Sequence, residues 1–264
     1  MALATPISRL AIALALCLGL FAGTNQTRAT PPSVETGFAA YAKRNFQTAQ
    51  TRYRSAPAET AAAWRFAQAC FDLAEFATNQ TDRASVAEQG IAACQQALAR
   101  ESNSAPAYYY LGMNLGQLAR TRGLSALKLV SQMQRAFARA HDLDERFDWA
   151  GPDRNLGLLY RDAPTFASIG SRSKAREHLQ RAAELAPRYP ENRLNLIESY
   201  LQWGESTKAQ RELAVLQELW PGARTNFVGE AWAASWADWD QRLKKLTKRI
   251  EAPVKSLGAP RTHP

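Results

Sequence analysis

The chain has 264 residues, of which 22% are charged and 46% hydrophobic, a composition typical of a soluble protein with one sizeable hydrophobic core. Its formal net charge of +9 comes from cations that are spread along amphipathic segments rather than gathered in blocks, which argues against a nucleic-acid-binding protein. Alanine, leucine, arginine and glutamine are abundant and β-branched residues are scarce, so the composition predicts helices throughout.

The first 29 residues have the pattern of a signal peptide. Arg9 precedes an apolar run from Leu10 to Ala22, which is too short to span a bilayer permanently and is followed by small and polar residues. We therefore predict that residues 1–29 form a signal peptide, cleaved after the apolar run or after Ala29, and that the protein is exported to the periplasm. An uncleaved N-terminal membrane anchor is an alternative. A lipoprotein signal at Cys17 is disfavoured, because Leu16 stands where such signals have a small residue.

The folded domain is predicted to span residues 30–250 and to begin with a half-repeat. Between residues 34 and 54, aromatic residues and alanine recur at helical spacing. A break at Asn45 would divide this segment into two short helices that cover the first full repeat.

Four helical hairpins are predicted to follow, at about residues 61–100, 105–145, 150–187 and 190–221. In each, small and large apolar residues alternate at helical spacing, so that the small ones allow two helices to approach closely and the large ones fill the space beside them.

The third hairpin shows the pattern most clearly. Its first helix has Leu156-Gly157-x2-Tyr160, and its second begins Ala175-x3-Leu179. A proline closes the third and the fourth hairpin, at Pro187 and Pro221, where we expect it to lie just beyond the helix end.

The first three hairpins are longer than a minimal repeat of about 34 residues. Comparison with the fourth hairpin places about six to nine extra residues in the turn between the two helices of each. Such turns lie along one rim of a solenoid, so these insertions are predicted to form rim loops that extend a binding face.

A last helix is predicted at residues 226–250, with Trp232, Trp236 and Trp239 on one side and lysines and arginines around the other. This helix could cap the open end of the solenoid, form a homo-oligomer through the tryptophans, or lie on an anionic membrane surface. Residues 251–264 contain three prolines and no periodicity, which predicts a disordered tail.

Cys70 and Cys94 are the two cysteines of the predicted mature chain, on consecutive antiparallel helices. In an oxidising compartment they could form a disulfide. They could equally be two free thiols that pack as small apolar residues.

We find no signature of catalysis, of a metal site or of a cofactor in the sequence. The nucleophile elbow, the phosphate-binding loop, the dinucleotide glycine pattern and His-Glu-x-x-His are absent. The three histidines, His141, His178 and His263, are isolated, without a partner at metal-ligand spacing. The sequence therefore predicts a protein that is not an enzyme.

One loop has the composition of an anion site. It runs from Tyr160 to Lys174, carries Arg161 and Arg172, and precedes a predicted helix whose N-terminal N–H groups could hold a carboxylate or a phosphate. Arg154 could add a charge. The alternative is an ordered rim loop with a serine as helix cap and its cations in solvent.

Tyrosine side chains extend the predicted ligand site. Three consecutive tyrosines, residues 108–110, face three directions on their helix, so that at least one ring, for which we choose Tyr109, is expected to face the groove. The predicted ligand-binding residues are Tyr109, Arg154, Tyr160, Arg161, Arg172 and Lys174.

On these residues the chain resembles the tetratricopeptide-repeat (TPR) superfamily over about residues 60–221. The loop from Tyr160 to Ala175, with Glu191-Asn192-x-Leu194 after it, is also similar to the periplasmic TPR component associated with TRAP transporters. The resemblance implies an all-α solenoid of helical hairpins without enzymatic activity, which presents a groove or a pore to ligands or partner proteins.

Three functions are consistent with these features. The first is a non-enzymatic exported scaffold that binds a protein partner or a ligand on its concave face and rim loops. Such a scaffold would lie at most next to a membrane and would not bind nucleic acid. The second is a periplasmic accessory subunit that binds a small organic anion for a transporter. The third is an envelope assembly protein that oligomerises.

Overall fold

The computed structural model describes residues 32–166 and 168–251, which form ten α-helices. The helices are α1 (Pro32–Ser55), α2 (Thr60–Glu75), α3 (Gln80–Arg100), α4 (Ala105–Ala119), α5 (Ala126–Leu143), α6 (Phe147–Asp162), α7 (Arg172–Leu185), α8 (Pro190–Gln202), α9 (Ser206–Asn226) and α10 (Glu230–Glu251), with a 3-10 turn, η1 (Gly123–Ser125), before α5. The predicted signal peptide and residues 252–264 of the predicted tail lie outside the described residues.

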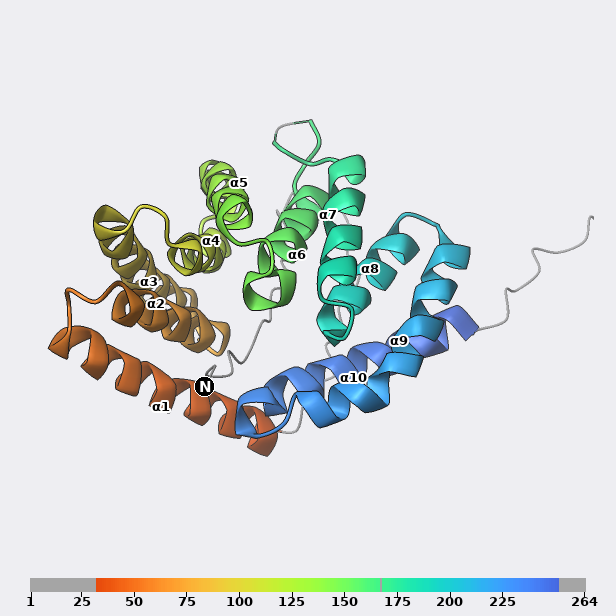
Figure 1. The fold of residues 1–264 in the computed structure, drawn as a ribbon, viewed down its shortest axis with the longest axis horizontal. Helices are drawn as coiled ribbons and strands as arrows, with labels where there is room; N and C mark the ends of the chain where they lie inside the picture. Colours follow the sequence, from red (N-terminus) through yellow and green to blue (C-terminus); the bar gives the residue numbers. More distant parts are fainter. Residues whose placement is uncertain (1–31, 167, 252–264) are drawn as a thin grey trace, which may run out of the picture.

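The helices pack as consecutive antiparallel hairpins in a curved row, which confirms the predicted all-α hairpin solenoid (Figure 1). The hairpins are α2–α3, α4–α5, α6–α7 and α8–α9. The first helices of successive hairpins pack against one another along the row, whereas consecutive second helices of the described chain make no contacts of that extent. The first helices therefore line the concave side of the row, and the second helices spread apart on the convex side.

Close approach within a hairpin depends on glycine. A Cβ atom on Gly157 would lie 2.6 Å from Cγ of Leu179, and one on Gly112 would lie 2.5 Å from the ring of Phe137. Both separations are shorter than carbon atoms tolerate, so only glycine lets α6 pack on α7, and α4 on α5, at this distance.

Two local predictions were wrong. Helix α1 continues through Asn45, so the N-terminal half-repeat is one helix and not two. Helix α9 continues through Pro221 to Asn226; the missing N–H of this proline is tolerated near the helix end, on an exposed surface. Pro187, in contrast, does lie beyond its helix, which ends at Leu185.

The predicted rim insertions are present only in part. The first hairpin has a tight turn at residues 76–79, because Asn79 caps α3 early, its Oδ1 accepting from the N–H of Asp82 at 2.8 Å. The surplus residues lengthen α3 to 21 residues, since each residue added to a helix gains a backbone hydrogen bond. A longer loop does separate α6 from α7, at residues 163–171.

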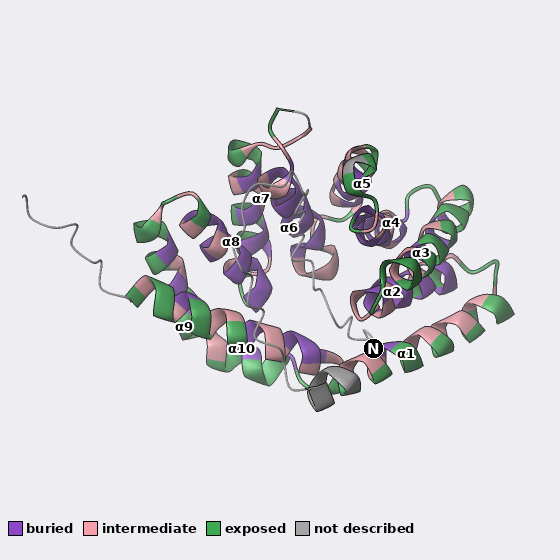
Figure 2. Ribbon diagram, turned by 180° about the vertical axis from the view of Figure 1, so that it is seen from behind, coloured by how far each residue is buried: buried purple, intermediate pink, exposed green. Residues whose placement is uncertain are grey.

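Helices α1 and α10 come from the two ends of the row and meet along its concave side, where Arg44 Nη2 of α1 is 2.6 Å from Glu230 Oε1 of α10 (Figures 1 and 2). Figure 2 shows the buried residues concentrated where the helices face the interior of the row. Both charged groups of the pair are exposed, so it contributes little to stability.

The tryptophans of α10 pack inside the chain itself. Trp232 and Trp239 are buried, with Trp232 5.2 Å from Trp149 and Trp239 5.4 Å from Tyr189 between ring centroids. Trp236 is half-buried and donates its Nε1–H to the carbonyl of Phe227. The helix thus caps the last hairpins, and the two buried rings are not accessible to a second copy of the chain.

Cys70 and Cys94 are buried and unbridged, on the neighbouring helices α2 and α3. Burial raises the pKa of each thiol, so both are protonated and behave as small apolar groups. None of the helices within residues 32–166 and 168–251 has the length and apolar character that a membrane crossing requires.

Candidate functional site

The first helix of the third hairpin begins with an unusual left-handed turn. Asp148, Trp149 and Ala150 have φ angles of 51°, 53° and 62°, and a right-handed helix follows from Gly151 and Pro152 onward. Each non-glycine residue in this conformation costs about 1–3 kcal/mol, and the strain persists only where surrounding groups enforce it.

Arg154, one turn further along α6, holds this turn in place. Its guanidinium is completely buried and donates to the carbonyls of Asp148 and Trp149 at 3.3 Å and to Oδ2 of Asp148 at 2.8 Å. The carbonyls of a left-handed turn cannot join the helical hydrogen-bond ladder, so this side chain supplies the donors that they would otherwise lack.

Neighbouring hairpins complete the network on both sides. Tyr109 of α4 donates its hydroxyl proton to Asp148 Oδ2 at 2.6 Å and accepts from Arg154 at 3.2 Å. Asn192 of α8 accepts from Arg154 at 3.1 Å and donates to the carbonyls of Trp149 and Ala182 at 3.0 and 2.9 Å. One arginine thereby connects the first helices of three successive hairpins in the middle of the concave side.

The electrostatics of this network follow from its burial. Burial alone would lower the pKa of Arg154, but the surrounding acidic groups, with Tyr109 first, outweigh it and keep the guanidinium charged. Glu191 of α8 is also buried, and the loss of hydration raises its pKa from 4.5 to about 7, although Arg154 and Arg242 oppose the shift. The concave side therefore contains ionisable groups that are held away from water.

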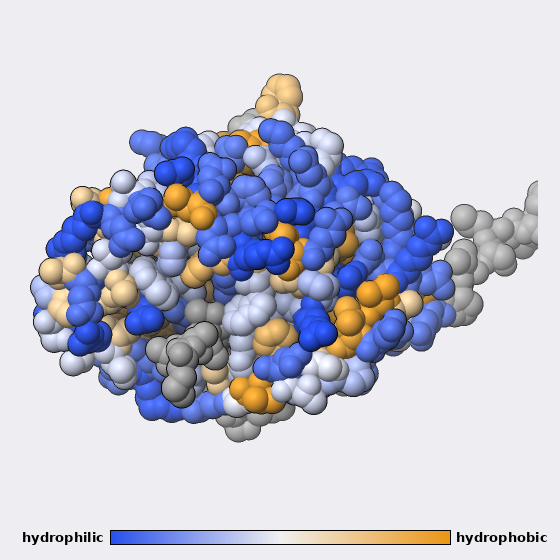
Figure 3. Space-filling view, in the orientation of Figure 1, coloured by the Kyte–Doolittle hydropathy of each residue, from blue (hydrophilic) through white to orange (hydrophobic). Residues whose placement is uncertain are grey.

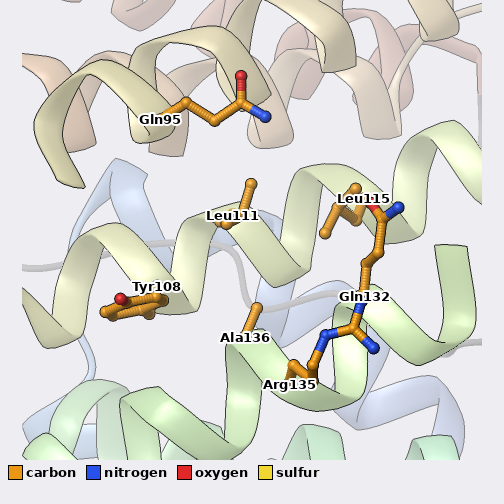
Figure 4. A pocket seen from close by; sticks show the side chains of 7 residues that line it. All are labelled: Gln95, Tyr108, Leu111, Leu115, Gln132, Arg135 and Ala136. Atoms are coloured by element: carbon orange, nitrogen blue, oxygen red, sulfur yellow. The ribbon is translucent and has the colours of Figure 1, made fainter. Parts of the chain in front are cut away.

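On the convex side, between the second helices that spread apart, the described residues form at least two grooves. The first, about 230 Å³, lies over α4 between α3 and α5 (Figure 4). Leu111 and Leu115 lie along its floor, and Gln95, Tyr108 and Ala136 also line it.

The second groove, about 580 Å³, lies over α6 between α5 and α7 and is polar. Asp153 lies at its base with only 1% of its side chain exposed, 3.0 Å from Nδ1 of His141 and 2.8 Å from Nδ1 of His178. A carboxylate only accepts hydrogen bonds, so Nδ1 of each ring donates and Nε2 is the free nitrogen. The ring of Tyr160 stacks on His178 at 5.5 Å.

The face of the molecule seen in Figure 1 has a mostly polar surface. Figure 3 shows this face as predominantly hydrophilic, with hydrophobic residues in small separate patches. Such scattered patches are normal for a protein surface and do not by themselves indicate an interface.

Comparisons with known proteins identify the fold. The structure is similar to that of TTC0263, a thermophilic TPR protein in Thermus thermophilus, with a TM-score of 0.55 and 19% identity over 81% of this chain and 96% of that one. The chain has a TPR-like fold. It is also similar to the structure of MamA, with a TM-score of 0.49 and 16% identity over 68% of this chain and 89% of that one.

At the level of sequence, residues 34–148 match the family described as RMD1-3, regulator of microtubule dynamics protein 1-3. No curated protein matches the sequence.

In the TPR framework, the predicted ligand residues separate into two groups. Tyr109 and Arg154 occupy corresponding positions of successive repeats on the concave side and contact each other. Arg154 was expected to join the cations of the loop, but the contacts described above are with α4, α8 and its own turn instead.

The loop residues do not converge on one point. Arg161 forms two hydrogen bonds with Asp162, at 2.6 and 2.8 Å, and Arg172 pairs with Glu205 of α9. Lys174 lies over the ring of Tyr160, 5.3 Å from its centroid. Ser171 caps α7, as the rim-loop alternative expects, its hydroxyl accepting from the N–H of Lys174.

Sequence reasoning did not connect His141 with His178, which we had described as isolated. They meet because α5 and α7 flank α6 in successive hairpins, which becomes evident only once the hairpins are stacked. One signal was present: Asp153 stands at the position where the first two repeats have Trp64 and Tyr108, and a carboxylate there needs partners.

Proposed function

We propose that this TPR-like protein is a non-enzymatic scaffold whose concave face binds a segment of a partner protein. The observation that carries the proposal is the strained turn at residues 148–150, enforced by a buried arginine in the middle of that face. Strained backbone of this kind clusters at binding sites, because a rigid surface that is formed in advance loses less entropy when a ligand binds.

The fold supports the same function. Solenoids of helical hairpins present extended concave surfaces, and the first helices here are tied to one another across three hairpins by the network around Arg154. The structure of the site is therefore suited to an extended polypeptide that crosses several repeats.

The second function considered, binding of a small organic anion for a transporter, finds less support. It would require cations that face a common space, whereas Arg161 and Arg172 are each engaged by a carboxylate of the chain itself. The third, assembly through the α10 tryptophans, would require rings that the fold instead buries.

Export to the periplasm is part of the proposal and is based on residues 1–29 alone. Fractionation of a bacterial host that expresses the full chain, followed by N-terminal sequencing, tests it. Recovery of the protein in the periplasm without the leader supports export; an intact N-terminus in the cytoplasmic fraction contradicts it.

The binding function is tested by selecting random 12-residue peptides on phage against the immobilised full chain. Retained peptides should protect backbone amides of α2, α4, α6 and α8 from hydrogen exchange. Protection confined to α3, α5, α7 and α9, or the absence of any retained peptide, would overturn the proposal.

A further inference from the structure

The loop between α6 and α7 presents a phenylalanine to solvent. The side chain of Phe166 is fully exposed, and the other large hydrophobic side chains exposed in the described part of the chain are valines, Val215 and Val228. A single exposed hydrophobic residue is common on protein surfaces. The position of Phe166 and the charges near it therefore decide whether it has a role in binding.

The base of this loop holds its tip away from the core. The N–H of Gly170 donates to the carbonyl of Pro164 at 3.2 Å, and the N–H of Ser171 donates to the carbonyl of Tyr160 at 2.9 Å. A Cβ atom on Gly170 would lie 2.1 Å from the carbonyl oxygen of Ala163, so only glycine lets the two sides of the base approach this closely. The loop is thus closed at its base and projects beyond the end of α7 (Figure 1).

Cations gather at the base of the loop, in the first turns of α7 and α9. The carboxylate of Glu205 pairs with three of them at once: Arg172, Arg176 Nη1 at 3.0 Å and Lys208 Nζ at 2.8 Å. Three cations around one carboxylate leave an excess of two positive charges. Arg172 and Lys208 have 52% and 48% of their side chains exposed, so their remaining N–H groups can reach a ligand.

The other charges in the first two turns of α7 leave this end of the hairpins positive. Lys174 is exposed and adds a positive charge. Glu177 adds a negative one, but it lines the polar groove over α6. The loop between α6 and α7 and the first turns of α7 and α9 together form a surface that we call the cationic rim.

An exposed aromatic ring beside an excess of positive charge is suited to an anionic lipid surface. The ring enters the interface between headgroups and acyl chains, and the cations contact the headgroups. A protein partner fits this surface less well, because a stable protein interface covers about 800 Å² on each partner. The exposed large hydrophobic side chains of the described chain stand in different elements and do not form such a patch.

We propose that the cationic rim rests on an anionic lipid surface, with Phe166 inserted at the level of the headgroups and Arg172, Lys174 and Lys208 against their negative charges. The first helices, which line the concave side, take no part in this contact. The inference therefore goes beyond the proposed function and does not depend on it.

Flotation of the full chain with lipid vesicles tests the charges of the rim. We expect at least about tenfold stronger partitioning into phosphatidylcholine vesicles that contain about one third phosphatidylglycerol than into phosphatidylcholine alone. Lys174→Gln combined with Lys208→Gln should weaken partitioning into the anionic vesicles at least about tenfold. Arg139→Gln combined with Arg188→Gln removes two exposed cations at the opposite ends of α5 and α7, and should change it by less than about twofold.

The role of the ring is tested in the same vesicles. Phe166→Ser should weaken partitioning at least about threefold, because the interface loses an inserted aromatic ring. Val228→Ser, which changes an exposed hydrophobic residue between α9 and α10, is the matched control and should have no effect. In Phe166→Trp, the added fluorescence should be quenched by lipids brominated on their acyl chains.

The outcomes distinguish the lipid surface from other ligands. Equal partitioning into anionic and neutral vesicles, or equal losses in the two pairs of charge variants, overturns the proposal. Loss with the lysine variants but none with Phe166→Ser, and no quenching in Phe166→Trp, would show that the rim attracts anions without entering a membrane, and also overturns it. Selection of peptides on the concave face is a separate measurement, so the failure of either proposal leaves the other intact.

Discussion

The second and third hairpins pair their helices in the same way but differ in the chemistry of their convex side. In the groove over α4, corresponding positions of the repeat hold Gln95, Tyr108 and Ala136. In the groove over α6, the equivalent positions hold His141, Asp153 and His178. Where the second hairpin has a hydrophobic groove, the third has a buried carboxylate with two imidazoles, although the helices are paired in the same way in both.

The concave side repeats the contrast. Tyr109 of the second hairpin corresponds to Arg154 of the third, and the left-handed turn belongs to the third hairpin alone among the described residues. The helical hairpin is thus a frame on which a few positions can be altered, because the glycines and alanines that set helix approach are separate from the residues that line the two faces.

The comparison is tested most severely at Arg154. Arg154→Met should lower the free energy of unfolding by about 3–5 kcal/mol, since it leaves Asp148 and the carbonyls of the left-handed turn buried without donors. The measurement is urea unfolding followed by circular dichroism. Tyr109→Phe, which removes the hydroxyl that bonds Asp148 and Arg154, should cost less, about 1.5–3 kcal/mol. Equal losses in the two variants would show that the third hairpin is not special.

The fourth hairpin also buries an ionisable group, Glu191, and the stability of the fold should therefore depend on pH. The pKa of Glu191 is about 7 in the fold and 4.5 ordinarily, so the folded chain holds this proton more tightly than the unfolded chain. Its contribution to stability is therefore fully present below about pH 4.5, declines as the pH rises, and is lost above about pH 7. The total loss in the free energy of unfolding is about 3 kcal/mol.

Glu191→Gln should remove this decline. The variant is expected to unfold at nearly the same urea concentration as the parent at about pH 4.5 and at a higher one at about pH 8.5. Glu218→Gln, an exposed position of α9, serves as control. A difference between parent and Glu191→Gln that does not change with pH would contradict the assignment.

The histidine groove gives a smaller effect. Asp153→Asn should cost about 1–3 kcal/mol, because an amide cannot accept a hydrogen bond from both imidazoles at once. Nitrogen NMR of the two rings should show the Nδ1–H tautomer in the parent and a changed tautomer for at least one ring in the variant. Tyr108→Phe at the equivalent position should alter neither stability nor the histidine signals.

The apolar groove gives the smallest effect. Leu111 is partly exposed on its floor, so Leu111→Ala should cost only about 1 kcal/mol, less than a fully buried leucine. Thermal unfolding measures it, with Gln95→Ala as a neighbour expected to stay within about 0.5 kcal/mol of the parent. A loss as large as that of Asp153→Asn would remove the energetic distinction between the grooves.

Local pattern was sufficient to predict much of the fold and little of the site. Helical spacing around Leu156, Gly157 and Leu179 predicted the hairpins, because these residues report directly on which face is buried and how closely two helices pack. Helix ends were less predictable: whether extra residues extend α3 or its preceding turn depends on the cap at Asn79. The end of α9 was also not predictable from Pro221, because a helix can accommodate a proline near its end.

The sequence by itself determined that this chain forms paired helices stacked in a row, since periodicity and residue size act over a few turns and are visible in the order of residues. Only the tertiary structure decided which polar groups meet: Asp153 with His141 and His178, and Arg154 with Tyr109 and Asn192. These encounters join different hairpins, and their distances depend on how the whole row curves, which no local spacing specifies.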